Sequence, residues 1–328
     1  VELGKRLGFG ARAGFLNAVL RGYARERDQT RLLLEELKQS DPALGYSHPE
    51  WLVQRWEERW GREQTLKLLQ WNNSPAPIFA RLNRLKTDFS GLEDRWRKEG
   101  VEFEERNVDW VEPGVAFELR SHPPLAESES FQDGFFYVQD PSTLLAVEQL
   151  SPQSGETILD LCAAPGGKTT FIAQLMRNSG RIVACDAQPG RLHLVQENCA
   201  RLGVTCVETA NAPDAAMQFD RILVDAPCSN TGVLRRRVDL RWRLQAAEIV
   251  RLRKAQLALL AQAAPRLKAG GVLVYSTCSM EPEENQEVAK EFLDAHPQFK
   301  MEAERQLLPF TDNVDGAYVA RFKKQITQ

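Results

Sequence analysis

Two cysteines and one aspartate stand at the ends of short apolar runs in the second half of the chain. Asp225 ends one such run, Cys228 follows three residues later, and Cys278 comes just after a second run. Catalytic side chains of open α/β sheets gather where the strands end, so these three groups are expected at one edge of a sheet. Because a thiolate forms covalent intermediates with substrates, the pattern predicts a site with one or two reactive thiols.

Methylation of carbon 5 of cytosine is a reaction that uses such a set of groups. Carbon 5 is too weakly nucleophilic to attack a methyl donor, but a thiolate that adds to carbon 6 turns the ring into an enamine, which can. A base then removes the proton from carbon 5, and the thiol leaves. The two cysteines, Cys228 and Cys278, supply a nucleophile and a group that assists release, and Asp225 supplies an acid for the N3 and amino edge. The chemistry alone leaves open which cysteine attacks.

A glycine-rich turn precedes these groups and opens a helix after another apolar run. The turn contains Cys162, Ala163, Ala164, Pro165, Gly166, Gly167 and Lys168. A phosphate-binding P-loop needs glycine where Cys162 stands, so a nucleoside triphosphatase is disfavoured. Asp186 follows Gly167 by roughly 20 residues, the spacing at which a carboxylate reaches ribose hydroxyls. We therefore expect S-adenosylmethionine as the cofactor, with Asp160 and Asp225 as acidic groups near its sulfonium.

Composition places the chain among globular proteins without membrane spans. Its 328 residues suggest about two domains, and 43% hydrophobic residues are enough for full cores. No run of 18 apolar residues and no secretory signal is evident, so a cytoplasmic location is expected. The six cysteines show no C-x-x-C spacing, which favours reduced thiols over disulfides or a zinc site. The first residue is Val1, inside an amphipathic pattern, and we expect an upstream part to be missing.

One basic stretch stands out against a net charge of −3 and a pI near 6.0. Arg235-Arg236-Arg237 is followed by Arg241, Trp242 and Arg243, in the loop after Cys228. A charge run of this kind is usually a solvated face. Its place beside the expected cleft favours RNA contact, because guanidinium groups pair with phosphates and an indole stacks on a base.

The hydrophobic pattern changes along the chain from helical to α+β to α/β. Helices are expected over 1–25, with a break at Gly8 and Gly10, and over 49–69; short strands around one helix between 78 and 138 indicate a small α+β domain. From residue 155 strands alternate with helices, which predicts a mostly parallel sheet covered on both faces. Its strands are expected at Ile158–Leu161, Ile182–Cys185, Thr205–Val207, Ile222–Asp225 and Val272–Tyr275, with an antiparallel pair at 299–301 and 317–322.

Three sequence blocks resemble the signature of the RNA 5-methylcytosine methyltransferases. They are Cys162 to Thr169; Asp225-Ala226-Pro227-Cys228-Ser229 with Thr231-Gly232; and Thr277-Cys278-Ser279 with Pro282-Glu283-Glu284-Asn285. The resemblance implies a Rossmann-like α/β catalytic domain with a seven-stranded sheet over 141–328, preceded by an RRM-like α+β domain over 75–140. Residues 26–74 would be a helical linker region. Residues 1–25, with Phe15 to Arg21, look like the end of a NusB-like RNA-binding domain, which is typical of bacterial members that modify small-subunit rRNA.

The resemblance also implies roles for single residues. Cys278 would be the nucleophile and Cys228 would assist product release. Asp225 would lie between cofactor and base, and Lys168 would reach toward the base. The residues implied for the S-adenosylmethionine pocket are Cys162, Ala163, Ala164, Pro165, Gly166, Gly167, Lys168, Asp186, Arg191, Asn211 and Asp225, of which Asp186 would hold the ribose and Asn211 the adenine amino group, where the family often has Asp.

The expected partner is 16S rRNA, free of protein or early in assembly, acted on by a monomeric enzyme. Three other functions stay open. The same chemistry on tRNA is disfavoured by the NusB-like segment, and a non-catalytic RNA-binding assembly factor would not need both thiols. An amino-group methyltransferase that uses Asp225-Ala226-Pro227 would not need Cys278.

Overall fold

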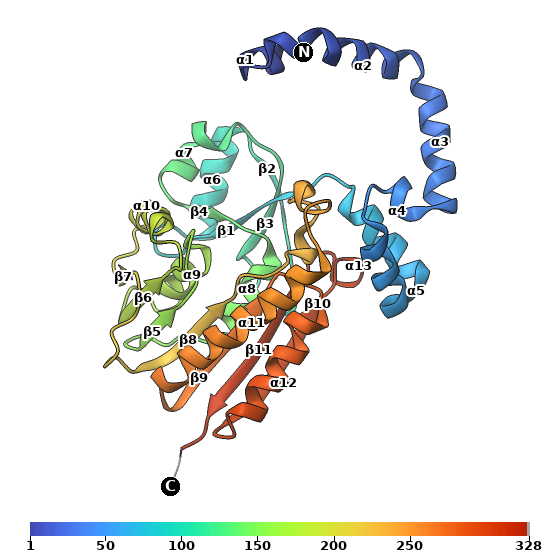
Figure 1. Cartoon of the computed structure of the whole chain (residues 1–328). Coiled ribbons are helices and arrows are strands. Elements are labelled where there is room, and N and C mark those ends of the chain that lie inside the picture. The colour runs from blue at the N-terminus through green and yellow to red at the C-terminus, as the bar shows by residue number, and fades with distance from the viewer. Residues whose placement is uncertain (327–328) are drawn as a thin grey trace. The chain divides into compact units, whose positions relative to one another are not determined.

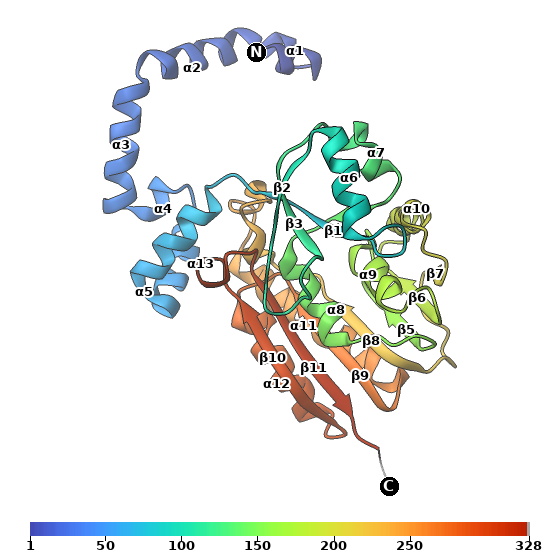
Figure 2. The ribbon, with the colours of Figure 1, turned by 180° about the vertical axis from the view of Figure 1, so that it is seen from behind.

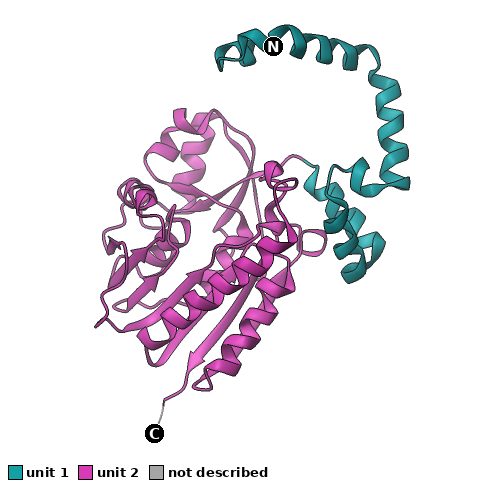
Figure 3. Ribbon diagram, in the orientation of Figure 1, with its two compact units in different colours: residues 1–74 teal, residues 75–328 magenta. Residues whose placement is uncertain are grey.

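The computed structural model describes residues 1–326 and divides into two compact units, residues 1–74 and the chain from Pro75 onward (Figure 3). Among the described residues, no helix combines the length and the apolar character that crossing a membrane requires. The domain boundaries expected at residues 25 and 140 stay predictions.

The first unit is helical. Its helices are α1 (Glu2–Arg6), α2 (Ala13–Arg25), α3 (Arg27–Ser40), α4 (Pro42–Gly45) and α5 (Glu50–Asn72). A 3₁₀ turn at Gly10–Arg12 separates α1 from α2, which confirms the predicted break between two helical pieces. The helices α1, α2 and α3 contain no buried residue, whereas α5 buries Trp56 against His48, with ring centroids 6.1 Å apart.

The second unit begins with the predicted small α+β fold. Its antiparallel sheet has the order β2 (Glu102–Glu105), β3 (Ala116–Ser121), β1 (Ile78–Leu82) and β4 (Phe136–Val138). Helix α6 (Phe89–Glu99) begins at Asp88, whose carboxylate accepts a hydrogen bond from the Gly91 amide. Buried Leu92 and Trp96 of α6 pack on Phe117 of the sheet.

A larger, mostly parallel sheet of seven strands follows. Its order is β10 (Phe299–Leu307), β11 (Ala317–Lys324), β9 (Leu267–Thr277), β8 (Phe219–Asp225), β5 (Thr157–Asp160), β6 (Arg181–Cys185) and β7 (Val207–Ala210). The strands from β5 to β9 pair in parallel, and β10 and β11 add an antiparallel edge. The predicted fold class is therefore confirmed.

Helices cover both faces of this sheet, which explains why its strands read as continuous apolar runs. They are α8 (Leu144–Leu150), α9 (Gly167–Leu175), α10 (Leu192–Leu202), α11 (Ala246–Ala263) and α12 (Gln286–Ala295). Ile158 packs in one cluster with Phe171 of α9, and its neighbour Leu159 packs in another with Phe292 of α12. Figure 1 shows α11 and α12 in front of the sheet, and Figure 2 shows α8 in front from the opposite side.

The third parallel strand was predicted at Thr205–Val207, and this prediction is wrong by about three residues, since β7 spans Val207–Ala210. Gly203 ends α10 in the left-handed region at φ 71°, and the amide of Val204 bonds back to Cys199. The buried Val204 therefore belongs to the end of the helix. The strand itself lies at an edge of the sheet, where a strong apolar signal is absent.

Candidate active site

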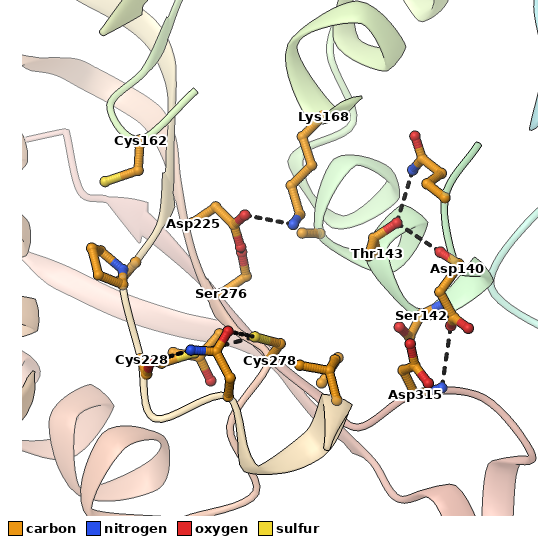
Figure 4. A pocket seen from close by; sticks show the side chains of 18 of the residues that line it. Asp140, Ser142, Thr143, Cys162, Lys168, Asp225, Cys228, Ser276, Cys278 and Asp315 are labelled. Atoms are coloured by element: carbon orange, nitrogen blue, oxygen red, sulfur yellow. Dashed lines mark hydrogen bonds and ion pairs between the residues drawn. The ribbon is translucent and has the colours of Figure 1, made fainter. Parts of the chain in front are cut away.

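A cavity of about 730 Å³ lies at the carboxyl edge of the parallel strands, inside the second unit (Figure 4). Nine predicted site residues line it: Cys162, Ala164, Pro165, Lys168, Asp186, Arg191, Asp225, Cys228 and Cys278. Ala163 and Gly167 line an adjoining hollow of about 210 Å³. The loops after β5, β6, β8 and β9 thus bring most of the predicted set together.

The two cysteines face each other across neighbouring strand ends. Asp225 of β8 is paired with Ser276 of β9, so the loops that follow start side by side. The Sγ atoms of Cys228 and Cys278 are 3.3 Å apart. The Cys278 thiol also donates to Oδ1 of Asn230, at 3.2 Å, while the Asn230 amide donates to the Cys228 carbonyl.

Burial and neighbours distinguish the thiols. The hydrogen bond with Cys278 and burial raise the pKa of Cys228 well above its ordinary value, and the negative charge of Glu284 adds to this. The thiol of Cys228 therefore keeps its proton at neutral pH. Burial likewise raises the pKa of Cys162, whose side chain forms part of the wall beside Asp225.

Lys168 and Asp225 form an ion pair on the wall that faces the thiols (Figure 4). Lys168 Nζ is 2.6 Å from Asp225 Oδ2, and the Ser276 hydroxyl donates to Oδ1 at 2.7 Å. Burial by itself lowers the pKa of Lys168, but the charge and hydrogen bond of Asp225 outweigh it and raise the pKa overall. Lys168 is therefore a cation, and Asp225 is held in one orientation.

Asp186 organises the loop after β6. Its Oδ2 accepts from the Ala164 amide at 3.1 Å and its Oδ1 from the Gln188 amide at 2.9 Å. Arg191 lies 3.7 Å from the same carboxylate and donates to the Ala164 carbonyl at 3.1 Å. Each carboxylate oxygen still has a lone pair for a ligand hydroxyl.

The glycine-rich turn lets backbone come close to its surroundings. Gly166 has φ 104°, in the region that favours glycine, and a Cβ on Gly167 would lie 2.9 Å from a ring carbon of Tyr137. Together with the Asp186 carboxylate at the end of β6, this loop fits S-adenosylmethionine. Asp186 would hold the ribose hydroxyls, and the side chain of Asp225 would supply negative charge near the sulfonium.

Asp160 and Asn211 lie outside the described lining of the cavity. Asp160 is buried beneath the loop, where Oδ2 accepts from the Thr169 hydroxyl at 2.7 Å and Oδ1 accepts no hydrogen bond from the described part of the chain. Burial raises the pKa of Asp160 to about 7. Asn211 is exposed just after β7. The contact of Asn211 with an adenine ring stays a prediction.

Only one of three consecutive arginines is available at the cavity. Arg236 lies between two carboxylates, bonding to Asp315 at 2.5 Å and to Asp140 at 2.9 Å. Arg235 is 9% exposed and donates to the Pro75 carbonyl. Arg237 lines the cavity and is exposed, and its guanidinium makes no hydrogen bond or ion pair with another described residue. Two of the three arginines in the basic stretch therefore serve to hold other parts of the chain in place.

The sequence assigned no role to several polar groups that surround the thiols and Asp225. They are Asn230, Ser276, Ser229, Ser279, Gln256 and Glu284. Asn230 had a local signal, because Ser-Asn-Thr-Gly is a turn sequence and Asn tolerates its φ of 60°. Glu284 stands in the third signature block, but the sequence did not indicate its partners, because they lie up to 55 positions away in the chain.

Comparison with known families agrees with this geometry. The profile of 16S rRNA methyltransferase RsmB/F matches residues 147–323, and the profile of the RsmF/B-like ferredoxin-like domain matches residues 48–118. The chain is 36% identical to the probable ribosomal RNA small subunit methyltransferase B of Bacillus subtilis, over 99% of this chain and 77% of that protein. It is 36% identical to ribosomal RNA small subunit methyltransferase B of Vibrio cholerae, over 95% and 72%.

A solved structure extends the likeness to the fold. A methyltransferase homolog from Pyrococcus horikoshii superposes with a TM-score of 0.76 at 30% identity, over 87% of this chain and 98% of that one. The family matches cover more than half of the chain, and the predicted resemblance is confirmed. The chain therefore belongs to the RsmB/F family of 16S rRNA methyltransferases, enzymes that take their methyl group from S-adenosylmethionine.

Proposed function

We propose that this enzyme methylates carbon 5 of one cytosine in small-subunit rRNA through a covalent bond between Cys278 and carbon 6 of the base. One observation carries the proposal: two thiols 3.3 Å apart share a cavity with the Lys168–Asp225 ion pair and the cofactor loop. Transfer to an amino group or to a ribose would need no thiol pair.

Cys278 is proposed as the nucleophile because it is the more accessible of the two thiols and because its sulfur contacts Asn230. Its sulfur adds to carbon 6, and the electron pair of the double bond moves to carbon 5 and the ring. Lys168 supplies positive charge where negative charge develops on the base during this addition. When bound, S-adenosylmethionine supplies an electrophilic methyl group to carbon 5.

Asp225 is proposed to read the edge of the base. Lys168 and Ser276 each occupy one of its oxygens, and these two bonds fix the direction of the carboxylate. A carboxylate in this orientation accepts a hydrogen bond from the cytosine amino group, which uracil lacks. The pair therefore both activates the ring and selects cytosine.

Cys228 is proposed to complete the reaction. It lies against the attacking sulfur, so it is within reach of the proton on carbon 5 of the adduct. The thiol of Cys228 first gives its own proton to solvent; the thiolate that results is a strong base, because its pKa is raised, and it takes the proton from carbon 5. Removal of this proton re-forms the double bond and expels the thiolate of Cys278.

The test is transfer of labelled methyl from S-adenosylmethionine to a protein-free small-subunit rRNA transcript, with the product nucleoside identified. We expect 5-methylcytosine from the unmodified enzyme and none from Cys278→Ala. In Cys228→Ala the adduct should accumulate as a protein–RNA species that survives denaturing gels. Activity retained in Cys278→Ala would overturn the assignment of the nucleophile.

The same assay separates the remaining alternatives. A tRNA transcript methylated faster than small-subunit rRNA would move the substrate to tRNA. Methyl groups found on the amino nitrogen of cytosine would replace the covalent mechanism by direct transfer. RNA binding without methyl transfer or adduct in any variant would indicate an assembly factor.

A further inference from the structure

A buried carboxylate that takes no part in the proposed reaction lies behind the two thiols. Glu284 is fully buried and does not line the cavity. It hydrogen-bonds to the residues that directly follow the cysteines in the sequence, Ser229 after Cys228 and Ser279 after Cys278. One side chain thus holds both cysteine loops, although they follow different strands.

The two oxygens of Glu284 accept hydrogen bonds from different donors. Oε1 accepts from the Ser229 amide at 2.9 Å and from Gln256 Nε2 at 3.1 Å. Oε2 accepts from the Ser279 hydroxyl at 2.5 Å and from the Ser229 hydroxyl, and these two hydroxyl oxygens are 3.0 Å apart. Four donors on one buried carboxylate satisfy it fully, so its position is well determined.

The segment that carries Glu284 is itself tied to the end of β9. The Tyr275 hydroxyl donates to the Glu284 carbonyl at 2.5 Å. The side chain of Asn285 donates to the Ser279 carbonyl at 2.9 Å and accepts from the Thr277 hydroxyl at 2.6 Å. These hydrogen bonds hold the backbone that carries the Glu284 carboxylate in place.

We propose that Glu284 is a positioning residue that sets the spacing of the Cys228 and Cys278 sulfurs by holding the residue after each one. Glu284 touches neither sulfur through any hydrogen bond within residues 1–326. The expected effect of Glu284 on catalysis rests on the proposed function, but its effect on the spacing of the two sulfurs does not. A displacement of about 1 Å at reacting atoms lowers a rate by roughly 10²-fold, so the spacing matters to the reaction.

The structure defines a conservative variant. In Glu284→Gln the amide oxygen takes the place of Oε1, because its two donors are N–H groups that cannot accept. The amide nitrogen takes the place of Oε2, where the two serine hydroxyls turn to accept. All four contacts survive without the charge. Glu284→Ala removes all four, and Ser279→Ala removes the one that reaches the Cys278 loop.

Phenylarsine oxide is the probe, because it condenses with two neighbouring thiols to form two As–S bonds and one water. Bridged adducts resist a monothiol such as 2-mercaptoethanol and are removed by a dithiol. The unmodified enzyme should bind one monothiol-resistant equivalent, and Cys228→Ala and Cys278→Ala should bind none. This readout needs no RNA, so it is independent of the proposed function.

We expect Glu284→Gln to keep arsenical bridging and to keep kcat within about fivefold. Glu284→Ala should weaken bridging at least about tenfold and lower kcat roughly 10²-fold, with the KM values for RNA and S-adenosylmethionine within about threefold. Ser279→Ala should shift both quantities in the same direction by a smaller factor. Unchanged affinity for S-adenosylmethionine confirms that each variant is folded.

Two results would overturn the inference. One is Glu284→Ala or Ser279→Ala with unchanged bridging and unchanged kcat. The other is Glu284→Gln with losses as large as those of Glu284→Ala, since the charge and not the geometry would then be decisive. If bridging follows the expected order but no protein methylates rRNA, the spacing role stands and the proposed function fails.

Discussion

The cavity has two halves, and a buried carboxylate lies behind each. Behind the thiols, each oxygen of Glu284 accepts hydrogen bonds from two donors, so its hydrogen bonding is fully satisfied. Behind the cofactor loop, one oxygen of Asp160 accepts no hydrogen bond from residues 1–326, and burial raises the pKa of Asp160 to about 7. The carboxylate behind the thiols is thus fully engaged, whereas the carboxyl group beneath the cofactor loop is only partly engaged.

This difference matches what each half has to do. A covalent reaction requires sulfur atoms that are already placed, because their geometry enters the rate directly. A cofactor pocket has to bind a sulfonium cation and then release the neutral thioether that remains after methyl transfer, and an acid beneath the loop favours the cationic form.

The largest effect is expected for Asp225→Asn, at the boundary of the halves. The amide has no negative charge to pair with Lys168, and it has one acceptor oxygen where the carboxylate has two. The rate of methyl transfer should therefore fall about 10³-fold, equivalent to about 4 kcal/mol in activation free energy. The measurement is single-turnover transfer at saturating substrates. Asp220→Asn, at the other end of β8, is the matched control and should stay within about threefold. Similar rates for the two variants would contradict the role of Asp225.

Asp160→Asn tests the unsatisfied acid through pH. In the unmodified enzyme the unfolded carboxyl ionises near pH 4 while folded Asp160 keeps its proton to about pH 7. Stability contributed by Asp160 is therefore complete below pH 4 and is lost as pH rises to about 7. The variant lacks this loss, so its free energy of unfolding relative to the parent should rise between pH 4 and 8, by at most about 4 kcal/mol.

Urea unfolding at several pH values measures this difference. Saturating S-adenosylmethionine should make the difference smaller, because a bound cation lowers the pKa of a nearby acid. A difference that does not change with pH would show that Asp160 is ionised throughout, and the contrast between the two carboxylates would then be lost.

Asp186→Ala addresses the open side of the cofactor half. The variant loses the acceptor for ribose hydroxyls and the anchor of the Ala164 amide, so the Kd for S-adenosylmethionine should rise about 30-fold, or about 2 kcal/mol. Calorimetry measures the Kd, and arsenical bridging by the thiols should not change. Glu208→Ala, which removes an exposed carboxylate of β7, is the control. An unchanged Kd would rule out the predicted ribose contact.

The smallest effect is expected for Arg237→Ala at the rim. Its guanidinium is available for a phosphate, so the Kd for rRNA should rise about three- to tenfold, and the slope of log affinity against log salt should decrease by about 1. Arg181→Ala removes the same charge at the first residue of β6, the end of the strand away from the cavity, and should leave both quantities unchanged. Equal losses in the two variants would indicate a general charge effect.

The reactive residues were predictable because they follow strong local signals. Cys228, Cys278 and the glycine-rich turn each come directly after a strand whose two buried faces make it a continuous apolar run. Parallel strands end at the same edge, so strand ends alone place these residues together. The edge strand β7 has no such run, and its start was mispredicted.

The supporting residues were not predictable, because polar residues in loops look alike whether they are solvated or buried. Arg235, Arg236 and Arg237 form one basic stretch in the sequence, yet Arg236 forms ion pairs with Asp140 and Asp315, which are distant in the chain, while Arg237 stays exposed at the cavity. Glu284 likewise reads as part of an acidic turn. Burial and long-range partners, which local patterns do not encode, decide such roles.

The amino-acid sequence by itself therefore determined the sheet, the cofactor loop, the two thiols and the family. Tertiary structure alone decided that the sulfurs stand 3.3 Å apart, that Glu284 ties their loops together and that Arg237 is the available arginine. The physical reason is that apolar periodicity and turn residues act over a few positions. Hydrogen-bond satisfaction and desolvation depend on every group that folding brings near.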